Sequence, residues 1–167
     1  LERGAVRHPD KVFVRSLDQG TSITYAEALR LARGFRHHLK AKGIGANDRV
    51  ALLANNCLEH LMVYYGVMYY GATICTIHVE MNALIIDELI AALAPKLVLR
   101  EADLAGFLAG LAAESDAPLA RVNGPDDVAS IFYTSGTTET PKGVPCSFRD
   151  LETNVANAAG TFAIRED

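Results

Sequence analysis

The sequence predicts an α/β fold with a mostly parallel sheet covered by helices on both faces. Short, near-continuous apolar segments alternate along the chain with longer segments whose apolar residues recur at helical spacing. Strands of this kind are typical of a sheet that is buried on both faces. Parallel strands also need crossover connections, which helices of about 10–15 residues supply.

The elements follow from this alternation and from their end signals. The strands are expected over residues 12–15, 49–54, 72–77, 96–99 and 128–133. The helices are expected from Thr24 to Gly43, from the Asn55–Asn56 pair to about Tyr70, from Asn82 to Pro95, over residues 101–113, and from Ser147 onward. Thr24 and Glu27 fit a capping box, and Ser147 caps the last helix with Asp150 in its first turn. Residues 114–127 are expected to form a surface connection.

Length and composition restrict the kind of protein. The chain has 167 residues, of which 50% are hydrophobic and 22% are charged, and its formal net charge is -4. These values fit one domain or a large piece of one, and they exclude a disordered tail or a collagen-like repeat. Sixteen basic residues against twenty acidic ones provide no basic surface for nucleic acid, so no nucleic-acid partner is expected.

Cysteine spacing and one long apolar run bear on the cellular setting. Three cysteines without a CxxC pair indicate reduced, mostly buried thiols, no metal site and a cytoplasmic protein. Residues 61–79 contain no Asp, Glu, Lys or Arg and are long enough to cross a bilayer. Gly66 and Gly71 interrupt this run, and its four tyrosines would lack hydrogen-bond partners in lipid. We therefore expect a buried helix followed by a buried strand, and no integral membrane span.

The segment that carries chemistry follows the last predicted strand and reads TSGTTETPKG over residues 134–143. Its hydroxyls, glycines and Lys142 are suited to surrounding phosphate oxygens, because backbone amides in a turn form a concave anion site. It is not a Walker A loop, since Pro141 precedes the lysine and Gly143 follows it. Ser135 also lacks the flanking glycines of a nucleophile elbow. By composition alone, a flexible surface loop remains the alternative.

Residues 133–144 resemble the phosphate-binding signature of the adenylate-forming enzymes, which include acyl-CoA synthetases, aryl-CoA ligases, luciferases and peptide-synthetase adenylation domains. Three flanking segments agree in the expected order: residues 23–29 (ITYAEAL), residues 48–53 followed by Asn55 (DRVALL), and residues 66–72 before the next strand. The resemblance therefore covers nearly the whole chain. It implies the N-terminal part of the adenylate-forming fold, here residues 1–167 of a larger AMP-binding domain whose C-terminal part is missing.

The resemblance also implies a reaction. A small-molecule carboxylate attacks the α-phosphate of ATP, with Mg²⁺, to give an acyl-adenylate, and a thiol such as coenzyme A then takes the acyl group. In the family this segment holds the β- and γ-phosphates. The residues carried over for that role are Thr134, Ser135, Gly136, Thr137, Thr138, Thr140, Lys142 and Gly143. The resemblance implies no nucleophilic catalysis by Ser135 or Cys146, and the catalytic residues are unknown.

The sequence departs from the family pattern at two places. Glu139 stands where the signature usually has glycine. A positive φ there would strain it by about 1–3 kcal/mol, and its carboxylate would repel phosphate. Alternatively, Glu139 points to water and pairs weakly with Lys142. His78 lies where relatives often have a proline-containing turn; a contact with the ligand is one alternative for it, but we expect it to be partly buried and satisfied by backbone groups.

Three functions remain open at this point. The leading one is an AMP-forming acid–thiol ligase of the acyl-CoA synthetase type. The second is an adenylation domain that loads a carrier protein, and the third is a non-catalytic nucleotide-binding or interaction fragment. Because the family's later motifs and an initiator methionine are absent, we expect a piece of a longer enzyme that is inactive alone. If the polypeptide ended at Asp167, we would expect it to self-associate as a homo-oligomer, because its sheet would have unpaired edges.

Overall fold

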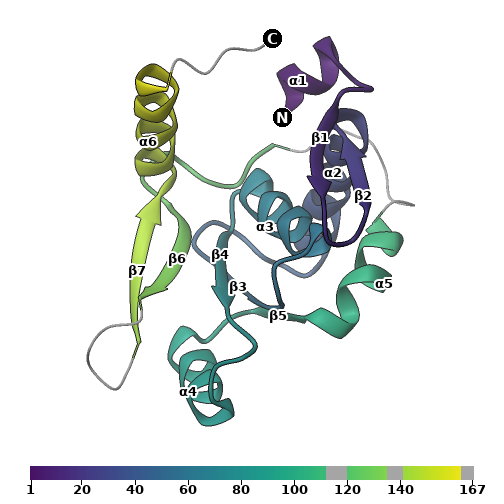
Figure 1. Cartoon of the computed structure of the whole chain (residues 1–167). Helices are drawn as coiled ribbons and strands as arrows, with labels where there is room; N and C mark the ends of the chain where they lie inside the picture. The colour runs from purple at the N-terminus through teal and green to yellow at the C-terminus, as the bar shows by residue number, and fades with distance from the viewer. Residues whose placement is uncertain (112–119, 135–140, 163–167) are drawn as a thin grey trace.

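A five-stranded sheet forms the centre of the computed structural model, which describes residues 1–111, 120–134 and 141–162 (Figure 1). The strands of this sheet are β3 (Arg49–Leu53), β4 (Thr73–Ile77), β5 (Leu97–Arg100), β6 (Val128–Thr134) and β7 (Lys142–Ser147). Their order is β5-β3-β4-β6-β7, with β7 alone antiparallel to its neighbour. A separate antiparallel hairpin joins β1 (Val12–Ser16) to β2 (Thr21–Thr24).

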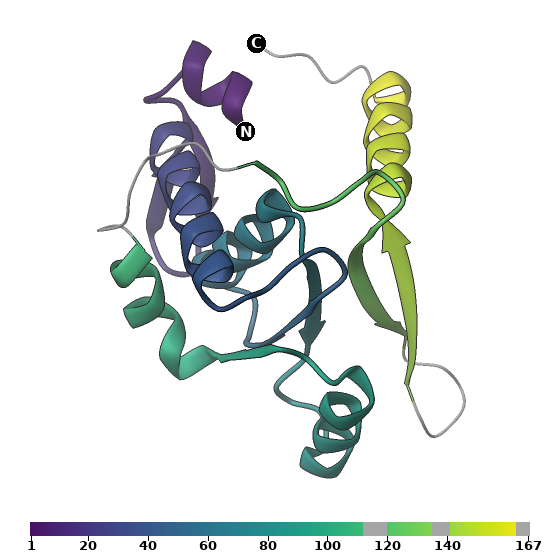
Figure 2. The same ribbon diagram turned by 180° about the vertical axis from the view of Figure 1, so that it is seen from behind.

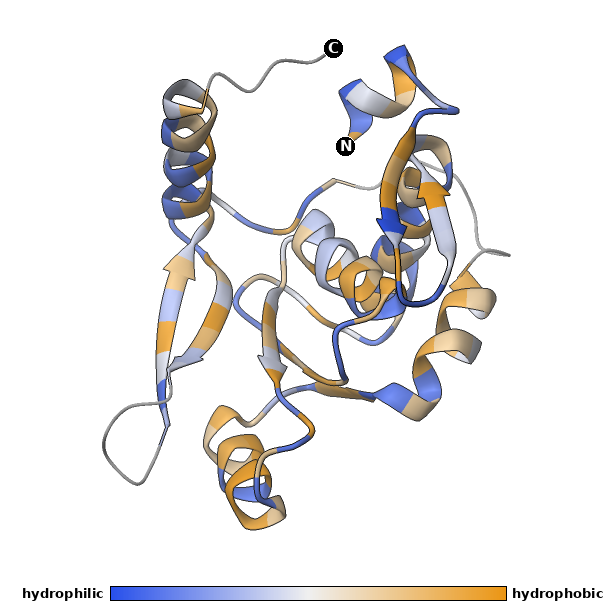
Figure 3. Ribbon diagram, in the orientation of Figure 1, coloured by the Kyte–Doolittle hydropathy of each residue, from blue (hydrophilic) through white to orange (hydrophobic). Residues whose placement is uncertain are grey.

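Helices cover both faces of this sheet, as the sequence predicts. They are α1 (Glu2–Arg7), α2 (Tyr25–Ala41), α3 (Leu58–Tyr70), α4 (Ala83–Leu93), α5 (Glu101–Leu111) and α6 (Phe148–Thr161). Val50 and Leu52 of β3 pack into one buried cluster with residues of α2, α3 and α5. Ala51 and Leu53 face the other way and pack against α4. Figures 1 and 2 show α4 apart from the other helices, and Figure 3 shows that it is hydrophobic along most of its length.

Most predicted helix ends are confirmed. Both capping boxes form: Thr24 with Glu27 at α2, and Ser147 with Asp150 at α6. Asn82 accepts a hydrogen bond from the amide of Leu84 and begins α4. Gly71 ends α3 with a φ of 105°, a left-handed conformation that only glycine adopts without strain.

The start of α3 differs from the prediction. Asn55 and Asn56 do not cap this helix; the thiol of Cys57 does, by accepting a hydrogen bond from the amide of His60 at 3.3 Å. Asn55 instead donates from its backbone and side-chain nitrogens to the carboxylate of Glu101, at 3.0 and 3.1 Å. Glu101 is the first residue of α5, so these two hydrogen bonds connect the turn after β3 to the start of α5.

Three elements of the structure were not predicted, and two predicted segments lie partly outside the described residues. Helix α1 and strands β2 and β7 are not among the elements predicted from the sequence. The predicted helix over residues 101–113 is described as far as Leu111, and the predicted connection over residues 114–127 is described from residue 120. Cys57, Cys75 and Cys146 are free, as predicted, but only Cys75 is fully buried. Among the helices that the structure describes, none has the length and apolar character needed to cross a membrane.

Candidate functional site

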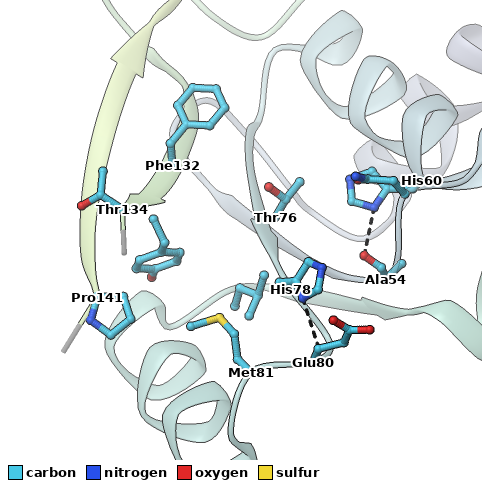
Figure 4. Close-up of a pocket in the computed structure, with 12 residues that line it drawn as sticks. Ala54, His60, Thr76, His78, Glu80, Met81, Phe132, Thr134 and Pro141 are labelled. Atoms are coloured by element: carbon cyan, nitrogen blue, oxygen red, sulfur yellow. Dashed lines mark hydrogen bonds between the residues drawn. The ribbon is translucent and has the colours of Figure 1, made fainter. Parts of the chain in front are cut away.

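The carboxyl ends of three parallel strands meet at one cleft. It has a volume of about 610 Å³ and is lined by Ala54 after β3, by His78 after β4, and by Phe132 and Thr134 at the end of β6 (Figure 4). Pro141, which precedes β7, completes the rim on that side. Ligands of open α/β sheets bind at this edge, and the volume lies within the range of small-molecule sites.

The two described ends of the predicted phosphate-binding segment face each other across the β6–β7 ladder. Thr134 pairs with Lys142, and the Thr134 hydroxyl donates a hydrogen bond to the Lys142 carbonyl at 3.4 Å. Both residues are exposed. Directly paired residues project from the same face of an antiparallel ladder, so Thr134 and Lys142 share one face of it, and of the two Thr134 lines the cleft.

Gly143 has a packing role that the sequence analysis did not foresee. It pairs with Tyr133, and a Cβ atom at this position would lie 3.1 Å from Ile131 Cγ2 and 3.2 Å from Tyr133 Cε1. The missing side chain thus lets the Tyr133 ring lie close to β7 at the wall of the cleft. Burial raises the pKa of Tyr133, and it raises the pKa of the neighbouring Cys75 thiol to about 11. Both groups are therefore uncharged at neutral pH.

The remaining members of the predicted segment, Ser135, Gly136, Thr137, Thr138, Glu139 and Thr140, lie outside the described residues. Of the predicted residues, Thr134 lines the cleft, and Lys142 and Gly143 lie on the adjoining strand β7; the phosphate-binding role of the whole segment stays a prediction.

Polar groups on the opposite side of the cleft were missed by the sequence analysis. Asn56, His60 and Thr76 line it, from the turn after β3, the first turn of α3 and the end of β4. Burial lowers the pKa of His60, against the effect of the Ala54 carbonyl that lies 3.2 Å from Nδ1. The signal that could have found Asn56 is its position in the short turn after a buried strand.

His78 also lies at this cleft, but in a different setting from the one predicted. Its Nδ1 accepts a hydrogen bond from the amide of Glu80 at 3.3 Å, which fits the expected backbone partner. The side chain is exposed at the rim, however, and the expectation of partial burial is wrong. The strand ends at Ile77, so His78 lies just beyond the buried part of β4.

The chemistry of the cleft fits a phosphorylated ligand. The Thr134 hydroxyl at one rim can donate a hydrogen bond to a phosphate oxygen, and Lys142 is the partner of Thr134 on β7, whereas Glu80 contributes a carboxylate to the same lining. Among the described residues, no group of three or more His, Cys, Asp or Glu side chains is arranged to hold a metal ion.

A cleft at the carboxyl ends of parallel strands is the typical ligand site of open α/β proteins. The chain belongs to the family of AMP-binding enzymes, which it matches over residues 1–167. A long-chain-fatty-acid–CoA ligase from Thermus thermophilus is 34% identical over 182 residues, covering 90% of this chain and 33% of the ligase. The phosphinothricin tripeptide synthetase PhsC from Streptomyces viridochromogenes is 28% identical over 183 residues, covering 100% of this chain and 17% of the synthetase.

The same relationship holds at the level of structure. The inhibitor-bound N-terminal domain of FACL13 from Mycobacterium tuberculosis superposes with a TM-score of 0.81 at 27% identity, covering 95% of this chain and 46% of that one. The fold is thus that of the adenylate-forming enzymes, in agreement with the resemblance found in the sequence. The chain spans a third or less of the length of the two curated relatives.

Proposed function

We propose that the chain is the N-terminal part of an AMP-forming acid–thiol ligase of the acyl-CoA synthetase type. In the first step a carboxylate oxygen bonds to the α-phosphorus of ATP, and pyrophosphate leaves. In the second step the thiol of coenzyme A attacks the acyl carbon, a thioester forms, and AMP leaves. The family match over the whole chain carries this proposal, and the cleft at the strand ends supports it.

The residues of the segment from Thr134 to Gly143 bind and orient the nucleotide in this proposal. The ammonium of Lys142 and the hydroxyl of Thr134 hold the β- and γ-phosphates, together with the hydroxyls and amides of residues 135–140. Their contribution is positioning and stabilisation of the charge on the departing pyrophosphate. Bound Mg²⁺ supplies further neutralisation of the phosphate charge. No residue of this chain is assigned as a general base or a nucleophile.

A second candidate is an adenylation domain that transfers its acyl group to a carrier protein. The similarity to PhsC, a peptide synthetase, favours it. The two candidates share the first step and differ in the thiol that accepts the acyl group. A cytoplasmic location is part of either proposal, and the free thiols of Cys57, Cys75 and Cys146 support it because the cytosol keeps thiols reduced.

Pyrophosphate exchange tests the shared first step. The intact polypeptide that contains this segment is expected to incorporate labelled pyrophosphate into ATP only when a suitable carboxylic acid is present. Residues 1–167 alone are expected to show no exchange, because a phosphate-binding segment cannot position the carboxylate. Addition of coenzyme A or of a carrier protein then separates the candidates by the thioester that forms. Absence of exchange with a broad panel of acids would contradict both.

Replacement of Lys142 tests, in the same assay, whether this lysine contributes to phosphate binding. Lys142→Met is expected to lower the exchange rate at least tenfold, because a charge-assisted contact to phosphate contributes about 1.5–3 kcal/mol. Lys40→Met is the matched control, since Lys40 is an exposed residue of α2, a helix that contributes no residue to the lining of the cleft. Equal rates for the two variants would remove Lys142 from the proposal.

A further inference from the structure

Strand β6 has a partner on each side at Ser130 and Ile131, where it pairs with β4 and with β7. Its last three residues, 132–134, pair with β7, and among the described residues they have no partner on β4. The end of the hairpin that carries Thr134 and Lys142 thus extends from the parallel sheet as two strands (Figure 1). A two-stranded ribbon is marginally stable in water, so its position depends on a further contact.

The side chain of Tyr133 connects this end of the hairpin to the parallel sheet. It is partly buried and packs against the buried cluster that β3, β4 and α4 form together. Its hydroxyl interacts with the thiol of Cys75, a fully buried residue of β4, and each group shifts the pKa of the other. The ring therefore contacts β4, the strand from which the β6 backbone has separated at this level.

The same ring also contacts β7. Tyr133 pairs with Gly143, and a Cβ atom on Gly143 would lie 3.2 Å from Tyr133 Cε1 and 3.1 Å from Ile131 Cγ2. Both distances are shorter than an ordinary van der Waals contact, so a side chain at position 143 would displace the ring or the strand. The absence of that side chain lets one aromatic ring touch the buried cluster and the backbone of β7 together.

The next pair of the ladder after Tyr133 and Gly143 is Thr134 with Lys142. One residue along a strand is a step of about 3.3 Å, so a shift of the first pair carries the second pair with it. Residues 135–141 join Thr134 to Lys142 along the chain. The contact of Tyr133 with the sheet therefore fixes both ends of the segment that we expect to hold phosphate.

We propose that Tyr133 is a positioning residue for the phosphate-binding segment: its ring, packed between the buried cluster and Gly143, holds Thr134 and Lys142 in place relative to the cleft. This inference rests on the proposed function, since it takes the segment to bind the phosphates of ATP. Tyr133 is assigned no contact with a reacting atom, and it acts through Thr134 and Lys142. A residue with a packing role alone would contribute to stability and leave the ATP affinity of the folded protein unchanged.

Truncation of the ring tests the inference in the intact polypeptide. Tyr133→Leu is expected to weaken the binding of ATP with Mg²⁺ about tenfold in calorimetric titration, because misplaced binding groups lose contacts with the phosphates. In pyrophosphate exchange the KM for ATP should rise by the same factor, and the KM for the acid should change less than about twofold. Tyr133→Phe keeps the ring and should stay within about twofold of the parent.

Tyr70→Leu is the matched control for lost stability. Tyr70 is a buried tyrosine of α3 whose hydroxyl donates a hydrogen bond to the Ile44 carbonyl at 2.6 Å, and it does not line the cleft. Its replacement should lower the free energy of unfolding and leave the ATP affinity of the folded protein unchanged. A loss of ATP affinity in Tyr70→Leu equal to that in Tyr133→Leu would overturn the inference.

Hydrogen–deuterium exchange tests the anchoring of the hairpin without any ligand. In Tyr133→Leu the amides of residues 132–134 and 142–144 are expected to exchange about tenfold faster, whereas those of β3 should not change. Equal amide exchange in the variant and the parent would overturn the inference, and so would equal ATP affinities in the two. A parent that binds no ATP would overturn the proposed function, and faster exchange in the variant would still support Tyr133 as the anchor of the hairpin.

Discussion

Gly66 and Gly106 are both helical glycines, but they face opposite surroundings. A Cβ atom on Gly66 of α3 would overlap the ring of Phe35, which is fully buried in the core between α2 and α3. Nothing lies within 4 Å of the equivalent position on Gly106 of α5. In the sequence, Gly66 is only an interruption of a long apolar run, and the packing shows that it permits the close approach of two helices.

Alanine substitutions at these glycines should therefore have opposite effects. Gly66→Ala is expected to lower the free energy of unfolding by about 1–3 kcal/mol through overpacking against Phe35. Gly106→Ala is expected to raise it by about 0.5–1 kcal/mol through helix propensity alone. Urea denaturation of the two variants and the parent measures both changes. Destabilisation of similar size at both positions would contradict the packing argument.

Glu139 is the residue whose chemistry departs most from the family signature. Replacement by glycine is expected to tighten the binding of ATP or pyrophosphate, because it removes a negative charge near the phosphates and any backbone strain. Calorimetric titration of the parent and Glu139→Gly compares their affinities. Unchanged or weaker binding by the variant would instead favour a carboxylate that points to water.

Among the secondary-structure elements, the antiparallel strand β7 was the main one that the sequence did not predict. Its residues are largely exposed, and it contains Gly143 and Pro145, which are typical of turns and edges rather than of buried strands. Pro145 is tolerated because β7 lies at the edge of the sheet. The parallel strands were predictable because both of their faces are buried, whereas β2 and β7 lack that signal. The cap of α3 was not predicted, because asparagine is a preferred capping residue and a cysteine thiol is an uncommon one, and Cys57 directly follows two asparagines.

One ion pair joins the turn after α2 to the residue before β5. The carboxylate of Asp48 accepts from Lys96 Nζ at 2.6 Å and from the Gly45 amide at 2.7 Å. Burial raises the pKa of Asp48, but the hydrogen bonds from Lys96 and Gly45 outweigh it, and the net effect is a pKa below the ordinary value of 3.8. A lowered carboxylate pKa stabilises the folded state above the unfolded pKa, and this contribution disappears as the pH falls through the folded pKa.

Asp48→Asn should therefore cost stability in a pH-dependent way. At pH 7 the free energy of unfolding is expected to fall by about 1 kcal/mol, since the pair is partly exposed. The difference from the parent should shrink as the pH is lowered below about 4. Asp87→Asn, at an exposed position on α4, is the control. Denaturation curves at several pH values measure the free energy of unfolding of the parent and the variant. A difference between the two that does not change with pH would argue against an electrostatic contribution from Asp48.

At the scale of the whole molecule, the fold and one half of the cleft were accessible from the sequence. The strand ends that border the cleft follow from a buried parallel sheet, and Thr134 at its rim belongs to the segment of residues 134–143, whose phosphate-binding role stays a prediction. The other half was not accessible, because Asn56, His60 and Thr76 belong to separate elements that meet only in the folded chain. An apolar groove of about 450 Å³ between α3 and α6, lined by Met68, Leu151 and other residues, was equally invisible in the sequence.

The most direct measurement is a crystal structure of the intact polypeptide with a non-hydrolysable ATP analogue and Mg²⁺. Our account predicts the β- and γ-phosphates at the cleft where β3, β4 and β6 end, with the Lys142 ammonium and backbone amides of residues 134–143 within hydrogen-bond distance of their oxygens. A triphosphate bound elsewhere, with Lys142 directed into solvent, would contradict it.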